Sequence, residues 1–86
     1  MLLQMRAESA VQEGIWALAL AYLKVISNLT DRGYFLRGEA HFGLGEYEKA
    51  AEAYLKSQMP AYDRLETCYK ELKDFEKAYY YACLGR

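Results

Sequence analysis

The chain has 86 residues, of which 53% are hydrophobic, so it is long enough for one small domain and too apolar to be disordered. Its 11 basic and 12 acidic residues are spread along the sequence and give a net charge of -1. This distribution argues against nucleic acid as a partner, because there is no block of Lys and Arg to neutralise phosphates.

The N-terminal segment shows no targeting signal. Its first ten residues, MLLQMRAESA, lack the charged start and the uninterrupted apolar core of a signal peptide. Residues 15–23 are wholly apolar, but nine residues are far fewer than the roughly 20 that a membrane-spanning helix requires. We therefore expect a soluble, cytoplasmic chain without a membrane span.

Hydrophobic spacing along the chain favours an all-α fold, since no strand-like alternation is long enough to compete with the helical periodicity. We expect a single domain over residues 1–86, with no Pro-, Gly- or Ser-rich linker to divide it. The predicted helices, taken in chain order, cover residues 2–13, 15–28, 33–44, 46–58, 61–72 and 74–84.

Local turn and cap residues support these boundaries. Thr30 or Asp31 is suited to cap the third helix, whose first turn exposes unpaired amides. Gly43 and Gly45 permit a tight reversal before the fourth helix. Pro60 suits the first turn of the fifth helix, where no amide hydrogen is needed.

The second predicted helix is apolar on nearly every side. Such a helix is expected to be buried or covered by a partner. We favour a central position between the first and second hairpins, with Lys24 and Ser27 as its only solvated edge. The alternative is a partner-binding face that is exposed in the isolated chain.

A repeated motif extends over most of the chain. In its clearest unit, small residues at Gly38 and Ala50 let two antiparallel helices approach while aromatic side chains fill the surrounding space. That unit reads Tyr34-x2-Arg37-Gly38-x2-His41, then Ala50-x3-Tyr54, then Pro60, and a second unit reads Tyr62-x2-Leu65-Glu66-x2-Tyr69, then Ala78-x3-Ala82. Leu44-x-Glu46-Tyr47-Glu48-Lys49-Ala50 recurs 28 residues later as Leu72-x-Asp74-Phe75-Glu76-Lys77-Ala78, and Trp16 and Ala19 stand 31 residues before Tyr47 and Ala50.

This motif resembles the tetratricopeptide repeat family, whose period is about 34 residues. The resemblance implies three antiparallel helical hairpins, approximately residues 1–29, 31–58 and 60–86, stacked as a short right-handed solenoid. The spacings of 31 and 28 residues are shorter than the family period, and Arg37, Glu66 and Ala82 replace larger consensus residues. The implied function is a protein-interaction scaffold without a catalytic step.

In the family, the first helix of each hairpin lines a concave groove. An extended or helical peptide with apolar anchors would suit a groove of this composition. It is equally consistent with the sequence that Phe35 and Phe42 pack between neighbouring hairpins and leave no peptide site. The clamp with which some family members hold an acidic chaperone tail is not supported, since only Arg64 keeps the expected charge. The groove candidates are Gln4, Glu8 and Val11 in the first unit, Phe35, Glu39 and Phe42 in the second, and Asp63, Thr67 and Lys70 in the third.

The last helix carries three consecutive tyrosines, Tyr79, Tyr80 and Tyr81. Three successive positions cover about 200° of an α-helix, so they cannot all face one core. We expect contact with another chain at this helix, homotypic or otherwise. The alternative function is therefore structural self-association, or an engineered repeat scaffold, forming an oligomer through exposed terminal helices.

Candidates for catalysis and metal binding are few. The single histidine, His41, occupies an aromatic position of the repeat motif and is expected to be structural. Cys68 and Cys83 form neither a CxxC pair nor a disulfide framework, so we expect buried free thiols. The glycines of GEAHFGLGE lack the Lys-Ser/Thr ending of a phosphate loop. We expect no catalytic residue, cofactor or metal.

Overall fold

Short turns divide the chain into three helical hairpins. The computed structural model describes residues 2–85, which form six helices and no strand, in agreement with the predicted all-α class. The hairpins pair α1 (Leu2–Gln12) with α2 (Trp16–Val25), α3 (Asp31–Gly43) with α4 (Tyr47–Ser57), and α5 (Tyr62–Glu71) with α6 (Phe75–Leu84).

The turns within the three hairpins have nearly the same geometry. Each contains one residue with positive φ, at Gly14 (77°), Gly45 (79°) and Lys73 (65°). In each turn the amide of the next residue donates a hydrogen bond to the carbonyl five positions earlier, at 2.8–2.9 Å. These residues stand 31 and 28 positions apart, the spacings of the sequence motif. The repeat is therefore visible in backbone geometry as well as in sequence.

Several predicted boundaries need correction. Helix α2 ends at Val25 because Ile26 takes an extended conformation (φ -81°, ψ 120°). Helix α3 begins at Asp31 because the Thr30 hydroxyl accepts a hydrogen bond from the Gly33 amide at 3.1 Å. Pro60 lies before α5, which begins at Tyr62, and so is not in its first turn.

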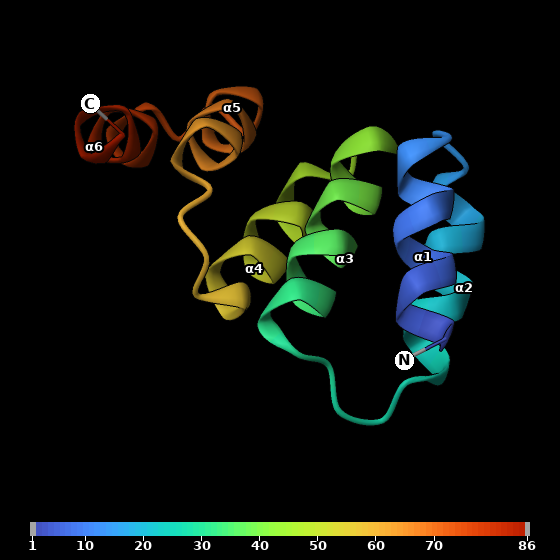
Figure 1. Cartoon of the computed structure of the whole chain (residues 1–86). Helices are drawn as coiled ribbons and strands as arrows, with labels where there is room; N and C mark the ends of the chain where they lie inside the picture. Colours follow the sequence, from blue (N-terminus) through green and yellow to red (C-terminus); the bar gives the residue numbers. More distant parts are fainter. Residues whose placement is uncertain (1, 86) are drawn as a thin grey trace.

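Helices that pack together are close in the sequence. Within each hairpin the two helices are in contact, α2 packs on α3, α4 packs on α5, and α1 also contacts α3. The described residues extend over 38 × 21 × 19 Å, with the first and third hairpins at opposite ends (Figure 1). In this view α1 to α4 are seen from the side and α5 and α6 are seen along their axes, so the stack twists at the third hairpin (Figure 1).

Two glycines allow close contact between helices, one of them in an unexpected role. A Cβ atom on Gly38 would lie 2.7 Å from the ring of Tyr54, as expected from the small-residue position in the motif. A Cβ atom on Gly43 would lie 2.2 Å from the ring of Trp16. Gly43 is thus the last residue of α3, and the Trp16 ring of α2 packs directly on it. The positive φ that the turn requires is at Gly45 instead.

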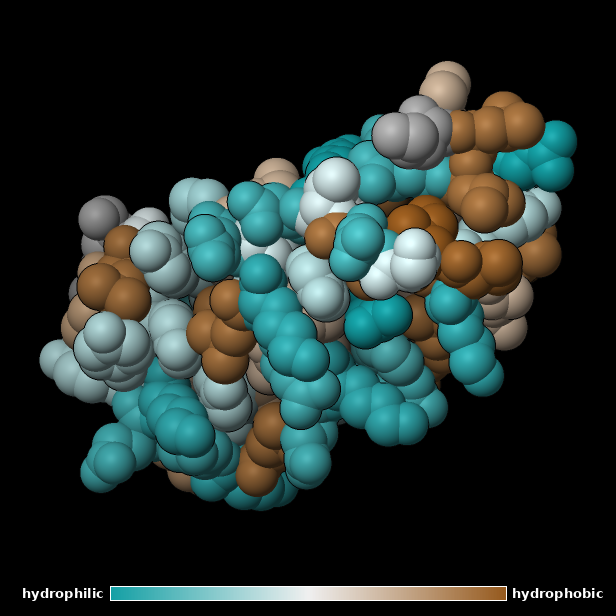
Figure 2. Space-filling model, turned by 90° about the horizontal axis from the view of Figure 1, so that it is seen from below, coloured by the Kyte–Doolittle hydropathy of each residue, from teal (hydrophilic) through white to brown (hydrophobic). Residues whose placement is uncertain are grey.

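The prediction for the second helix was wrong in its extent of burial. Ile15, Leu18 and Val25 are exposed in addition to Lys24 and Ser27. Within residues 2–85 the main neighbours of α2 are α1 and α3, which leave these side chains uncovered. Figure 2 shows apolar side chains gathered toward the end of the molecule that carries the first hairpin. Across residues 2–85, no helix has the length and apolarity to cross a membrane.

Candidate functional site

The first helices of the three hairpins are joined by two ion pairs. Glu8 on α1 accepts a hydrogen bond from Arg32 on α3 at 3.0 Å, and Glu39 on α3 accepts one from Arg64 on α5 at 3.1 Å. Both carboxylates were groove candidates, and both are bonded to the following hairpin. Their main partners are therefore inside the chain.

Glu39 also connects the surface pair to the core. The hydroxyl of Tyr54 on α4 donates a hydrogen bond to the same carboxylate oxygen that accepts from Arg64. Burial and this hydrogen bond to a carboxylate raise the pKa of Tyr54 well above its usual range. The carboxylate therefore holds together α3, α4 and α5, which belong to two hairpins.

The two phenylalanine candidates are half-buried. Phe35 packs with the ring of Tyr54 at a centroid distance of 5.7 Å, and the Arg32 guanidinium lies 5.5 Å from its centroid. Phe42 meets Tyr47 edge-on, and the Arg64 guanidinium lies 4.8 Å from its centroid. The structure thus favours the interpretation that these rings pack within and between hairpins.

The other groove candidates are also held by local contacts. Gln4 accepts a hydrogen bond from the Thr30 hydroxyl at 2.9 Å. Thr67 donates to the Asp63 carbonyl at 3.1 Å, and Lys70 pairs with Glu66 at 3.6 Å, both within α5. Val11 packs against the core of the first hairpin.

An open hollow lies beside some of the groove candidates, with a volume of about 500 Å³. It lies where the third hairpin meets the second, and Phe35, Asp63 and Arg64 contribute to its lining together with Tyr62 and Gly85. This part of the predicted groove is therefore hollowed. Tyr62 and Gly85 were not among the site candidates, since their place depends on how α6 ends against α5.

The tyrosines of α6 point in different directions. Tyr81 is half-buried and stacks on Tyr69 and Tyr62, at centroid distances of 5.6 and 6.3 Å. Tyr79 and Tyr80 are exposed, with 71% of the Tyr79 surface accessible to solvent. The neighbouring Cys83 thiol, one turn further along α6, raises the pKa of Tyr79.

The exposed surface of α6 is larger than the tyrosine run predicts. Phe75 is 62% exposed, and Leu84 is also exposed. Phe75 precedes Tyr79 by four residues, and Leu84 follows Tyr80 by four, so each pair forms a row along the helix and the two rows lie on different sides of it. We call the row of Phe75 and Tyr79 the α6 face. The four-residue spacing of Phe75 and Tyr79 in the sequence indicates this face, because residues four apart are neighbours on a helix.

The histidine and the thiols are separate features. The His41 imidazole is mostly buried and donates from Nδ1 to Glu46 at 2.7 Å, which lowers the pKa of that carboxyl group. Cys68 is buried, and burial raises the pKa of its thiol to about 11. The prediction that Cys83 is buried was wrong, because its side of α6 is open to solvent. Residues 2–85 contain no group of three or more His, Cys, Asp or Glu arranged to hold a metal ion.

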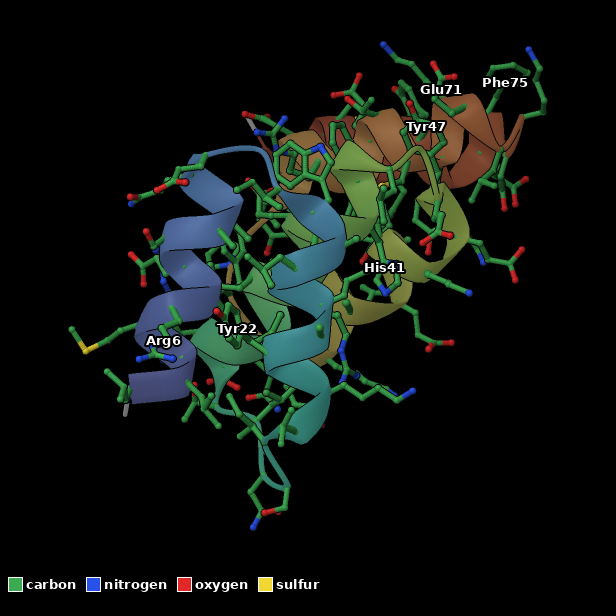
Figure 3. The ribbon with its side chains drawn as sticks, turned by 90° about the vertical axis from the view of Figure 1, so that its right-hand side faces the viewer. Arg6, Tyr22, His41, Tyr47, Glu71 and Phe75 are labelled. Atoms are coloured by element: carbon green, nitrogen blue, oxygen red, sulfur yellow. The ribbon has the colours of Figure 1, made fainter. Side chains whose placement is uncertain are left out.

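The outer side of the first hairpin is also open. A shallow hollow of about 220 Å³ lies between α1 and α2, with Arg6, Ile15, Leu18 and Tyr22 in its lining. Figure 3 shows Arg6 and Tyr22 beside each other on this hairpin, with Phe75 at the far edge of the ribbon. Apolar side chains are thus presented at both ends of the stack.

No family model, no curated protein and no solved structure that was compared with the chain matches it.

Proposed function

We propose that the chain is a cytoplasmic, non-catalytic protein-interaction scaffold made of shortened tetratricopeptide-like hairpins in a right-handed stack, and that the α6 face is its principal contact surface. The observation that carries this proposal is the exposure of two large aromatic side chains, Phe75 and Tyr79, in one row of a helix. Aromatic residues in such rows are typical of the buried centres of protein interfaces.

Comparison of equivalent positions within the chain supports this choice. Leu20, Ala51 and Tyr79 stand at the same repeat position, 31 and 28 residues apart. Leu20 packs in a core cluster with Ala40 of α3, and Ala51 packs in the cluster that includes Ala61 and α5. At this position in α2 and α4, the next hairpin therefore covers the side chain. Tyr79 occupies the position in α6 and is exposed.

The position of Phe75 follows the same rule. Trp16, Tyr47 and Phe75 are equivalent, and Trp16 lies directly over Gly43 of the next hairpin. Tyr47 is half-buried beside the core shared by the second and third hairpins. The α6 face therefore consists of positions that the fold uses for stacking one helix on another. It suits the apolar stripe of a partner helix.

The concave side is a second candidate, supported by the hollow of about 500 Å³ beside Phe35 and Arg64. A peptide bound there would meet Asp63 and Tyr62 on α5 as well. Its support is weaker, because Glu8 and Glu39 already bond to arginines of the chain. We therefore assign it a subsidiary role.

Site-specific photo-crosslinking tests the principal surface. A photoreactive phenylalanine analogue at Tyr79 is expected to give discrete protein adducts in cells of the source organism, because the side chain would lie inside the interface. The matched control is Glu52 on α4, which is exposed and equivalent to Tyr80, a residue outside the α6 face. The crosslinked protein, once purified, should bind the chain and lose at least about tenfold in affinity for a Tyr79→Ser variant. Equal adduct formation at positions 79 and 52 would contradict the proposal.

A further inference from the structure

The outer side of α1 repeats the pattern of a helix that has a neighbour. Leu2, Met5 and Ser9 stand 31 residues before Gly33, Leu36 and Ala40. The three α3 residues are buried, whereas Leu2 is 64% and Met5 is 67% exposed, and Ser9 is exposed as well. We call Leu2, Met5 and Ser9 the α1 face. It corresponds to the side of α3 that packs on the preceding hairpin.

The third hairpin shows the same correspondence. Ala61 and Cys68 stand 28 residues after Gly33 and Ala40, and both are buried in the cluster that joins α5 to α4. Two of the three first helices thus use these positions to contact the preceding hairpin. In α1 the same positions are open to solvent.

The internal junctions also show which side chains meet. Each side of a junction supplies both large and small groups: α2 contributes Leu23 and Ala19, and α3 contributes Leu36 and Ala40. At the second junction Tyr54 and Ala51 of α4 meet Leu65 and Cys68 of α5. Close packing of this kind requires large groups to face small or adaptable ones.

The two exposed faces satisfy this rule with each other. The α6 face is large and aromatic, since it consists of Phe75 and Tyr79. The α1 face offers small Ser9 and flexible Met5, whose thioether side chain adapts to aromatic surfaces. Two copies of the α6 face would oppose large rings to large rings, which is a poorer fit.

We propose that the partner of the α6 face is the α1 face of a second copy of this chain, so that copies stack head to tail and continue the internal repeat. The inference rests on the proposed function, since it takes the α6 face as the contact surface. A junction of this type is heterologous, because the two copies contribute different surfaces. It leaves one α6 face and one α1 face free, so the assembly lengthens with concentration.

Blocking each face separately tests this geometry. Met5→Glu places a charge at the α1 face and Tyr79→Glu places one at the α6 face. Each variant alone is expected to sediment as a 9.9 kDa monomer, whereas the wild-type chain gives a series of larger species whose mass rises with concentration. An equimolar mixture of the two variants is expected to form a dimer of twice that mass, because one α6 face and one α1 face remain intact.

The matched control is Val25→Glu, which adds the same charge to an exposed apolar position of the first hairpin. Its repeat equivalents, Lys56 and Leu84, are also exposed, so it does not belong to a stacking position. Val25→Glu should assemble with a dissociation constant within about threefold of the wild-type value, whereas each blocking change should raise it at least about tenfold. Far-UV circular dichroism verifies folding, and Met5→Gln and Tyr79→Ser replace any blocked variant that fails to fold.

Two results would overturn the inference alone. One is dimerisation of Met5→Glu alone, with no complex between the two variants when they are mixed. This result would identify an α6-to-α6 dimer. The other is a wild-type chain that stays monomeric throughout the dilution series. In either case crosslinks from position 79 to another protein or to a second α6 would leave the proposed function intact. The proposed function itself fails when position 79 gives no more adduct than position 52 and Tyr79→Glu assembles as the wild type does, a result that overturns the inference as well.

Discussion

Replacing Gly38 with alanine adds one methyl group where the Tyr54 ring of α4 lies against α3. The new Cβ atom would lie 2.7 Å from Cδ1 and Cε1 of Tyr54 and 3.0 Å from its Cγ. The ring has little room to move, since Tyr54 is 1% exposed and its hydroxyl is bonded to Glu39. The side chain of Phe35 closes another side of the ring. We therefore expect overpacking rather than relaxation.

Two effects of opposite sign determine the change in the free energy of unfolding. Alanine is favoured over glycine inside a helix by about 1 kcal/mol. Overpacking a filled core costs about 1–3 kcal/mol, and contacts with ring carbons this short belong to the upper part of that range. The Gly38→Ala variant should therefore lose about 1–2 kcal/mol of stability. For a domain of this size that corresponds to a fall in Tm of roughly 5–15 °C.

Thermal unfolding followed by circular dichroism measures this change in stability. The same substitution in a second variant background tests whether the Tyr54 ring causes the loss. In a Tyr54→Leu chain, which lacks the ring, Gly38→Ala should stabilise by up to about 1 kcal/mol, because only the helix preference remains. A higher Tm for Gly38→Ala in the wild-type background would refute the reasoning. It would mean that α3 and α4 do not approach as closely as the structure places them.

Three further predictions concern single side chains. Cys83 should react rapidly with a disulfide reagent at pH 8, whereas Cys68 should react only after unfolding. With a pKa of about 11, only about one in a thousand Cys68 thiols is ionised at pH 8. Rapid reaction of both thiols in the folded chain would therefore contradict the structure. Thr30→Ala should lower the free energy of unfolding by about 1 kcal/mol and Thr30→Ser by clearly less, because serine keeps the capping hydroxyl. Urea unfolding measures both changes, and equal losses of stability in the two variants would argue against the cap. The hydrogen bond from His41 lowers the pKa of Glu46 below its ordinary 4.5. On acidification the unfolded chain therefore takes up this proton before the folded chain does, so the free energy of unfolding falls as the pH drops below about 4.5. Acid titration of unfolding should show a smaller fall for Glu46→Gln than for the wild type, and superimposable curves would count against the pair.

The helices and their turns could largely be predicted from the sequence. Apolar spacing located all six helices of the described residues, and the motif spacing of 31 and 28 residues matches the turn residues Gly14, Gly45 and Lys73. The third of these has no glycine to mark it. Only its equivalence to the other two turns indicates its conformation. Ends of helices were harder to place, since the end of α2 depends on one extended residue, Ile26.

The burial of α2 illustrates what composition alone does not predict. An apolar residue is buried only where a neighbouring element covers it, and the number of neighbours depends on the position of a hairpin in the stack. Leu23 faces α3 and is fully buried, whereas Leu18 on the same helix is exposed. Both are leucines in one apolar run, so the sequence pattern predicts the same degree of burial for both.

The state of the groove candidates also depended on tertiary pairing. Placement of Glu8 and Glu39 on first helices followed from the repeat motif, and the structure places both there. Their arginine partners lie 24 and 25 residues further along the chain, on other helices. No helical periodicity links residues at such separations. Whether a carboxylate is free for a peptide or bonded inside the chain is therefore a property of the stacked hairpins.

The stacking of consecutive hairpins has a consequence for how the chain folds and opens. Its packing joins helices that are close in the sequence, so little chain entropy is lost before the first contacts form, and folding should be fast. The middle hairpin has neighbours on both sides, whereas each outer hairpin has one. Amide hydrogens should therefore exchange slowest in α3 and α4, and opening should begin at the outer hairpins. A partner seated on α6 would slow exchange throughout the third hairpin, even where it makes no contact.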